Sequence, residues 1–184
     1  MNVVQPIRNV EKLKVMADYF KIRNRRNYIM FIIGTGVGLR ISDILQLKKE
    51  DLLNTHIVLK ERKTRKSNRV RIPPPLRKEL TEYAKTLKDG EYIIKSRQGE
   101  NRPIDRSTAY RILREAAEFV SLDEIGTHTL RKTFGYHTYK QTKDVAMLQQ
   151  IFNHSSPSIT LNYIGINQDA MDDAMKNLKM PWLQ

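Results

Sequence analysis

The sequence predicts an α+β domain that is mainly α-helical and carries a small antiparallel β-sheet. Apolar residues recur at helical spacing over most of the chain. Only the middle of the chain alternates apolar and polar residues as strands do, on either side of a polar turn. The chain has 184 residues and no long glycine or serine linker, which indicates one domain with a C-terminal tail.

Three helices are expected before the sheet. Asn9 is a suitable N-cap for the first helix, in which apolar residues keep helical spacing as far as Phe20. The second helix is expected over residues 27–33 and should break in the glycine-rich residues 34–38. Ser42 then opens the third helix.

The sheet is expected to be a hairpin. Residues 56–59 and 69–72 alternate as strands, and the polar residues 63–68 between them are typical of a turn. The prolines at 73–75 end the second strand, and a helix follows over residues 76–87. Residues 92–94 are a further short strand candidate.

Helical spacing returns in the second half. Ser107 is expected to cap a helix with one apolar face. That face comprises Tyr110, Leu113, Ala117 and Val120. Helices are expected over residues 129–139 and 143–152, and Pro157 should begin a short helix that ends near Tyr163.

The charge predicts an anionic partner. Thirty-three Lys and Arg against twenty Asp and Glu leave a net charge of +13, and nucleic acid is the commonest partner for such a field. Composition alone fits a ribosomal protein equally well. The absence of cysteine excludes disulfides and thiolate metal sites. No signal peptide or membrane-length apolar stretch is visible, so we expect a cytoplasmic protein without membrane contact.

Five side chains carry a chemical hypothesis. A tyrosine, Tyr163, could attack a phosphodiester, while Arg40 and Arg131 hold anionic oxygens and the imidazoles of His128 and His154 place protons. Each has a plainer interpretation when taken alone. Arg40 could pair with an acid in a tight turn after the glycines, the histidines could be loop or surface residues, and Tyr163 could be a packing residue.

Other chemistries fit poorly. The four histidines never show the i, i+4 ligand spacing with a nearby carboxylate. The chain has neither a Gly-x-Ser-x-Gly elbow nor a Gly-Lys-Ser phosphate loop. No cofactor or metal is therefore expected.

In combination these residues resemble a known family. The segments Gly-Leu-Arg40-Ile-Ser-Asp and His128-Thr-Leu-Arg131, then Asn-His154-Ser-Ser with Tyr163 nine residues later, resemble the tyrosine recombinases, the phage integrases and Xer-like enzymes. The resemblance covers about residues 29–166. Three positions depart from the family pattern. Asp43 stands where Glu is usual, Lys132 replaces a second histidine, and Phe152-Asn153 replaces Leu-Gly.

The resemblance implies the tyrosine-recombinase catalytic fold and site-specific cleavage and rejoining of duplex DNA through a 3′-phosphotyrosyl intermediate, without metal or nucleotide. The catalytic residues that it implies are Arg40, Lys63, His128, Arg131, His154 and Tyr163. Lys63 is preferred over Lys60 and Lys66 as the general acid because it begins the hairpin turn. The DNA-binding residues expected on the hairpin are Arg62, Arg65, Lys66, Arg69 and Arg71.

Residues 1–166 are therefore expected to form the catalytic domain. Residues 167–184 form an amphipathic tail whose helix, over about residues 168–178, is capped by Asn167. Its apolar stripe comprises Met171, Ala174, Met175 and Leu178. This tail either docks on a neighbouring protomer or packs on its own domain.

We expect a monomer alone, a homotetramer on DNA and a nucleoid-associated location. The chain is either an excised catalytic domain or a compact recombinase. The alternatives in function are a type IB topoisomerase-like enzyme and a non-catalytic, sequence-specific DNA-binding module.

Overall fold

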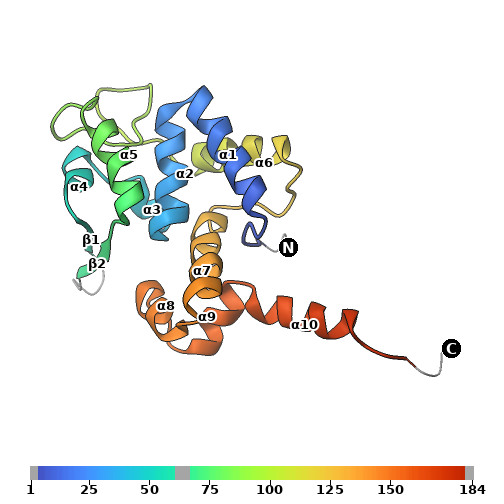
Figure 1. The fold of residues 1–184 in the computed structure, drawn as a ribbon. Coiled ribbons are helices and arrows are strands. Elements are labelled where there is room, and N and C mark those ends of the chain that lie inside the picture. Colours follow the sequence, from blue (N-terminus) through green and yellow to red (C-terminus); the bar gives the residue numbers. More distant parts are fainter. Residues whose placement is uncertain (1–3, 61–66, 181–184) are drawn as a thin grey trace.

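The structure, a computed structural model, describes residues 4–60 and 67–180 and is mainly helical, as predicted (Figure 1). The described residues form ten helices and a two-stranded antiparallel sheet. The elements are α1 (Val10–Arg23), α2 (Arg25–Val37), α3 (Ile41–Ile44), α4 (Lys49–Leu53), β1 (His56–Lys60), β2 (Ser67–Arg71), α5 (Pro74–Ala84), α6 (Arg106–Phe119), α7 (Thr129–Thr142), α8 (Val145–Phe152), α9 (Pro157–Tyr163) and α10 (Ile166–Lys176).

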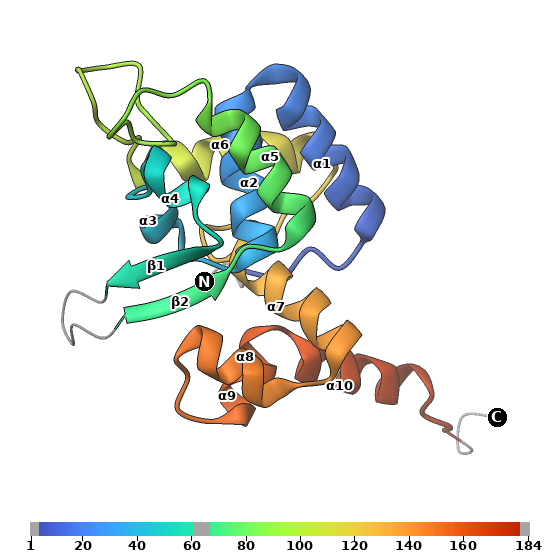
Figure 2. The same cartoon turned by 60° about the vertical axis from the view of Figure 1, so that its left-hand side comes forward.

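Two hydrophobic clusters organise these elements. The main core surrounds α2, which is apolar on nearly all sides and packs against α1, α5 and α7. A second, smaller cluster is built on the buried residues Leu148, Phe152 and Ile164. Helix α7 leads from the main body to this smaller cluster, and α10 extends away from α8 and α9 (Figures 1 and 2). The polypeptide around Tyr163 therefore depends on a small core of its own.

Local signals placed several helix ends correctly. Asn9 caps α1, because its side chain accepts a hydrogen bond from the backbone N–H of Lys12 at 3.1 Å. Ser156 caps α9 in the same way, with Pro157 at the first helical position. As predicted, Tyr163 is the last residue of α9.

The second helix is longer than predicted, because it reaches Val37 instead of ending at residue 33. Helix α2 continues through Gly34 and Gly36 and ends only at Gly38, whose φ of 70° is left-handed. A Cβ on Gly34 would lie 2.5 Å from Cδ1 of Leu130, so this glycine allows α2 and α7 to pack closely. Gly34 and Gly36 are therefore helical and do not form a loop before Arg40.

Three smaller expectations also need correction. Residues 92–94 form no strand; Tyr92 makes only an isolated bridge to Lys48. Helix α6 is capped by Asp105 rather than Ser107, because the Asp105 carboxylate accepts from the N–H of Thr108 at 2.6 Å. Tyr110 is exposed rather than on the buried face of α6.

The last helix begins earlier than predicted. Gly165, with a φ of 82°, precedes it at the N-cap position that the sequence analysis gave to Asn167. Helix α10 has no buried residue, and the apolar side chains of Met171, Met175 and Leu178 are exposed. The stripe therefore does not pack on its own domain. No helix of the described residues is long and apolar enough to cross a membrane.

Candidate active site

Arg131 lies at the centre of the site and is almost completely buried. Its side chain leaves the first turn of α7 and is 5% exposed. One terminal nitrogen donates to the carbonyl of Gly38 at 2.5 Å, and the other donates to the carbonyl of Phe152 at 3.2 Å. The guanidinium also lies 4.4 Å from the centre of the Phe152 ring. Arg131 therefore connects the end of α2 with the end of α8.

The charge of Arg131 persists despite this burial. Burial, together with the positive charge of Arg40, lowers the pKa of Arg131 to about 10. The group therefore stays cationic at neutral pH. A guanidinium has five N–H donors, so two carbonyl contacts leave donors for an anion.

Arg40 supplies a second, accessible cation. It follows the left-handed Gly38 and precedes α3 as its N-cap residue. The pairing with Asp43 that the sequence suggested is present but long, at 4.0 Å, and 47% of the Arg40 side chain is exposed. Such a pair stabilises the fold little, so Arg40 can exchange it for an anionic ligand.

Tyr163 lies between the two histidines. Its hydroxyl is 3.2 Å from Nδ1 of His128. Its ring centre is 5.1 Å from that of His154 and 5.5 Å from that of Phe152. Burial raises the pKa of Tyr163, and the charges of Arg131 and Arg40 oppose that rise. The hydroxyl therefore remains protonated near neutral pH and could act as a nucleophile only with the help of a base.

Both histidine rings are neutral at pH 7, because the pKa of each is lowered from its ordinary value. His128, at the N-cap of α7, has its pKa lowered by burial and by the charges of Arg131, Lys132 and Arg40. His154 follows the left-handed Asn153 and has its pKa lowered by burial, Arg131 and Arg40. Both rings also lie next to Tyr163, so the two histidines belong to one site.

A buried threonine orients His154. Its Nδ1 lies 3.0 Å from the hydroxyl of Thr160, which is fully buried in α9. That contact commits one ring nitrogen to the protein and leaves Nε2 for another partner. Sequence reasoning gave no role to Thr160, since a threonine six residues after a histidine has no local signature.

The predicted hairpin residues divide into two groups. Lys63, Arg62, Arg65 and Lys66 lie outside the described residues. Arg69 and Arg71 are exposed on β2 and alternate with the buried Val70. In both views β1 and β2 extend on the same side of α7 as α8 (Figures 1 and 2).

Lys132 was noted only as a departure from the family pattern. Its ammonium lies 5.2 Å from the centre of the Tyr163 ring and donates to the carbonyl of Val4 at 2.7 Å. Lys132 therefore links the tyrosine to the N-terminal segment, residues 4–8. The substitution was visible in the sequence, but its contacts were not.

The described residues contain no cluster of side chains suited to bind a metal ion. Among residues 4–60 and 67–180, no group of three or more His, Asp or Glu is arranged to hold a metal ion. What the site offers is two guanidinium groups, two neutral imidazoles and a protonated phenol. This set can bind a phosphate diester, take a proton from the phenol and stabilise added negative charge.

Comparisons with known proteins agree with this geometry. The model of the phage integrase family matches residues 7–169. The probable integrase/recombinase YoeC of Bacillus subtilis is 51% identical over 177 residues, which cover 96% of this chain and 97% of YoeC. The crystal structure of XerA recombinase matches with a TM-score of 0.76 at 22% identity, over 96% of this chain and 67% of that one. XerH site-specific recombinase, solved with palindromic difH substrate, matches with a TM-score of 0.71 at 19% identity. This chain spans 54% of the XerH chain.

Proposed function

The chain belongs to the phage integrase family and is a DNA-cleaving and rejoining enzyme, a tyrosine recombinase, and we propose that it acts through a 3′-phosphotyrosyl intermediate formed on Tyr163. The observation that carries this proposal is the 3.2 Å contact between the Tyr163 hydroxyl and Nδ1 of His128, beside two arginines.

The first step is a proton transfer. As the tyrosine oxygen attacks phosphorus, the phenolic proton passes to Nδ1 of His128. The lowered pKa of His128 supports this role, because only a neutral imidazole can accept a proton. The raised pKa of Tyr163 makes such a base necessary.

The second requirement is charge stabilisation. The transition state places negative charge on the two non-bridging phosphate oxygens, which Arg40 and Arg131 would hold. His154 would donate a third hydrogen bond through Nε2, provided that Thr160 donates to Nδ1. Arg131 is rigidly held by two carbonyls, so its remaining donors are fixed in place before the substrate binds.

The third requirement is a proton for the leaving 5′-oxygen. The bond between phosphorus and the 5′-oxygen breaks, and that oxygen receives a proton from a general acid. We assign this role to Lys63 of the hairpin. The covalent phosphotyrosyl bond keeps the energy of the phosphodiester, so a 5′-hydroxyl of another strand can reverse the reaction without a nucleotide or metal cofactor.

Duplex DNA is the proposed partner, with four protomers acting on two duplexes. The net charge of +13 and the exposed arginines of β2 support a polyanionic partner. The bound substrate of XerH is that protein's own site, so the sequence recognised by this chain has to be determined by experiment.

Covalent trapping tests the proposal. A library of nicked duplexes with a randomised central segment is incubated with the protein, and DNA that resists denaturing washes is sequenced. A nick beside the cleaved bond lets the 5′-hydroxyl fragment diffuse away, so the adduct accumulates. We expect adducts with the wild-type protein and none with Tyr163→Phe. Binding to DNA without any adduct would instead indicate a non-catalytic DNA-binding module.

A further inference from the structure

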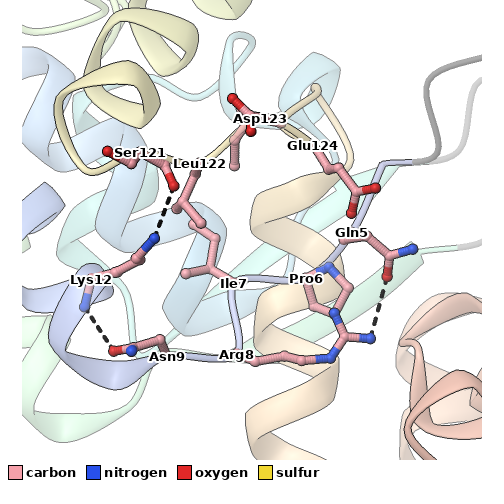
Figure 3. A pocket seen from close by; sticks show the side chains of 11 residues that line it. Gln5, Pro6, Ile7, Arg8, Asn9, Lys12, Ser121, Leu122, Asp123 and Glu124 are labelled. Atoms are coloured by element: carbon pink, nitrogen blue, oxygen red, sulfur yellow. Dashed lines mark hydrogen bonds between the residues drawn. The ribbon is translucent and has the colours of Figure 1, made fainter. Parts of the chain in front are cut away.

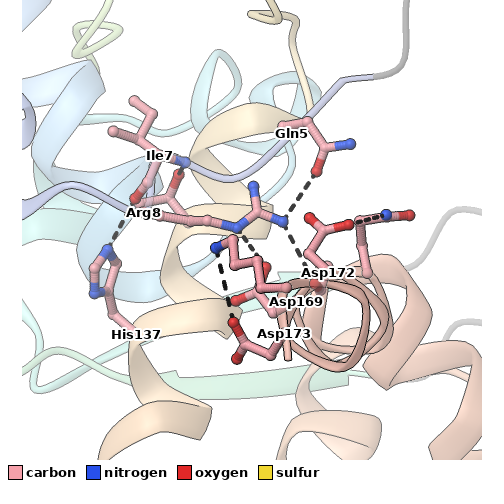
Figure 4. Close-up of polar contacts among 11 residues, drawn as sticks. Gln5, Ile7, Arg8, His137, Asp169, Asp172 and Asp173 are labelled. Carbon is pink, nitrogen blue, oxygen red and sulfur yellow. Dashed lines mark hydrogen bonds and ion pairs between the residues drawn. The ribbon is translucent and has the colours of Figure 1, made fainter. Parts of the chain in front are cut away.

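The N-terminal segment, residues 4–8, crosses the face of α7 behind the active site. The backbone N–H of Gln5 donates to the carbonyl of Glu124 at 3.1 Å, and together they line a pocket beside the loop after α6 (Figure 3). The N–H of Ile7 donates to the buried hydroxyl of Thr133 at 2.9 Å. The Ile7 carbonyl lies 2.9 Å from Nε2 of His137 (Figure 4). The segment is therefore fixed to the helix that carries His128 and Arg131.

From this segment Arg8 reaches the residues that follow Tyr163. Its Nε donates to Oδ1 of Asp169 at 2.7 Å, in an ion pair whose side chains are 32% and 21% exposed (Figure 4). A terminal nitrogen also donates to the carbonyl of Gly165 at 3.4 Å. Gly165 comes two residues after Tyr163 and is the N-cap residue of α10. The Arg8 side chain therefore binds the start of α10 at two points, the backbone carbonyl of Gly165 and the side chain of Asp169.

The fit around Gly165 is close. A Cβ at this position would lie 2.7 Å from a terminal nitrogen of Arg8 and 3.3 Å from Cγ of Pro6. Asp169 also forms a hydrogen bond with the side chain of Tyr136. Burial is the main cause that raises the pKa of Tyr136 to about 12, and this hydrogen bond is the next. Tyr136 lies on α7, so Asp169 connects α7, α10 and the N-terminal segment.

The N-terminal segment also contacts Lys132, which lies against the ring of Tyr163. The carbonyl of Val4 accepts from Lys132, whose ammonium lies over the ring of Tyr163. The N-terminal segment therefore contacts both a residue against the ring and the backbone that follows it.

Positioning matters here because the core around Tyr163 is small. Leu148, Phe152 and Ile164 are the fully buried members of that cluster, and α10 buries no residue. Small cores with few buried contacts open at low free-energy cost. A displacement of about 1 Å at a reacting group can reduce a rate by about 100-fold.

We propose that Arg8 is a positioning residue for Tyr163: its ion pair with Asp169 fastens the first turn of α10 to the N-terminal segment and so holds the tyrosine against His128 and Arg131. Arg8 touches no reacting atom. The inference rests on the proposed role of Tyr163 as the nucleophile.

The test separates the cleavage rate from DNA affinity. Arg8→Gln, Asp169→Asn and the double variant are compared with wild type on a trapped nicked substrate, by single-turnover adduct formation at saturating DNA. We expect each single variant to lose about 10-fold to 100-fold in rate with an unchanged Kd for DNA. The loss in the double variant should be smaller than the product of the two single losses, because both changes remove the same ion pair, although Arg8 also contacts Gly165 and Asp169 also contacts Tyr136. Arg8→Lys keeps the charge and should retain most of the rate.

Arg114→Gln is the matched control. It removes an arginine from an ion pair with Glu118 on α6, at 3.1 Å, and changes the net charge equally. Its rate should stay at the wild-type value. The inference is overturned if Arg8→Gln cleaves as fast as this control, or if its rate falls only in step with a weaker Kd, which would make Arg8 a DNA contact.

A second measurement does not depend on cleavage. With 3-fluorotyrosine placed at position 163, the fluorine resonance reports the surroundings of that ring. It should change in Arg8→Gln and Asp169→Asn, and stay unchanged in Arg114→Gln. An unchanged resonance in the Arg8 variant overturns the inference. If instead the wild-type protein forms no Tyr163-dependent adduct, the proposed function fails, and the resonance alone decides whether Arg8 positions the ring.

Discussion

Tyr163 and His128, 35 residues apart in the sequence, meet at 3.2 Å between the phenolic oxygen and Nδ1. The tyrosine ends α9, and the histidine caps α7. Their pKa values are shifted in opposite directions, upward for the phenol and downward for the imidazole, with burial as the first cause of both. At neutral pH the pair therefore consists of a protonated phenol and an unprotonated imidazole, which is the arrangement that the proposed proton transfer requires.

This pair predicts a pH dependence. Because the pKa of His128 lies below the ordinary 6.5, the imidazole is neutral at pH 7 and gains a proton only in more acidic solution. The second-order rate constant of adduct formation should therefore be level at neutral pH and fall only in solutions more acidic than the ordinary histidine pKa of 6.5. NMR titration of His128 in the free protein should give the same pKa. A rate that rises as the pH falls would contradict the role of His128 as a base.

The two arginines should differ in their effect on stability. Arg131→Ala removes the donor from two carbonyls and should lower the free energy of unfolding by about 1–3 kcal/mol or more. Arg40→Ala changes an exposed side chain and should stay within about 0.5 kcal/mol of wild type. Each should slow adduct formation on the order of 100-fold. Urea unfolding and single-turnover cleavage measure the two effects, and equal losses of stability would argue against the buried position of Arg131.

Cleavage should not require a divalent metal. Arg40 and Arg131 already provide the positive charge that a metal would bring to the phosphate oxygens. Adduct formation should therefore proceed at the same rate in excess EDTA. A loss of activity that added magnesium restores would contradict the proposed mechanism.

DNA affinity should depend strongly on salt through the hairpin. Each phosphate contact contributes about 0.9 to the slope of log K against log salt. Neutralising Arg65 and Lys66 together, or the exposed Arg69 and Arg71, should lower that slope by up to about 1.8 on any DNA sequence. Fluorescence anisotropy over a range of salt concentrations measures the slope. An unchanged slope would mean that the hairpin does not touch DNA.

The tail should act in assembly. Deleting the residues after Ile166 should impair cooperative binding and strand exchange more than DNA contact, but that deletion also removes Asp169. Replacing Met171, Met175 and Leu178 by glutamine tests the apolar stripe alone, because it leaves the ion pair between Arg8 and Asp169 in place. These three residues are 54%, 68% and 50% exposed, so the change should not disturb the fold. Gel-shift assays of two-protomer and four-protomer complexes measure the effect. Synapsis at wild-type concentration would exclude docking of this stripe on a neighbour.

The sequence by itself identified the family and most of the helices and strands. Helix caps such as Asn9 and Ser156 and the alternation in β1 follow from interactions within a few residues, so local pattern suffices to find them. The motifs around Arg40, His128, Arg131, His154 and Tyr163 placed the reactive groups in a recognisable order, although no single one of them was decisive.

Only the tertiary structure decided how these groups are held. Whether a glycine bends a chain or admits a neighbouring helix depends on packing, and Gly34 proved to be a contact with Leu130. The burial of Arg131 on Phe152 and the place of Lys132 over Tyr163 likewise depend on helices that meet in space. Arg8 and Asp169 are 161 residues apart, and no local rule pairs residues at that separation. Their contact forms because residues 4–8 and the first turn of α10 both pack against α7.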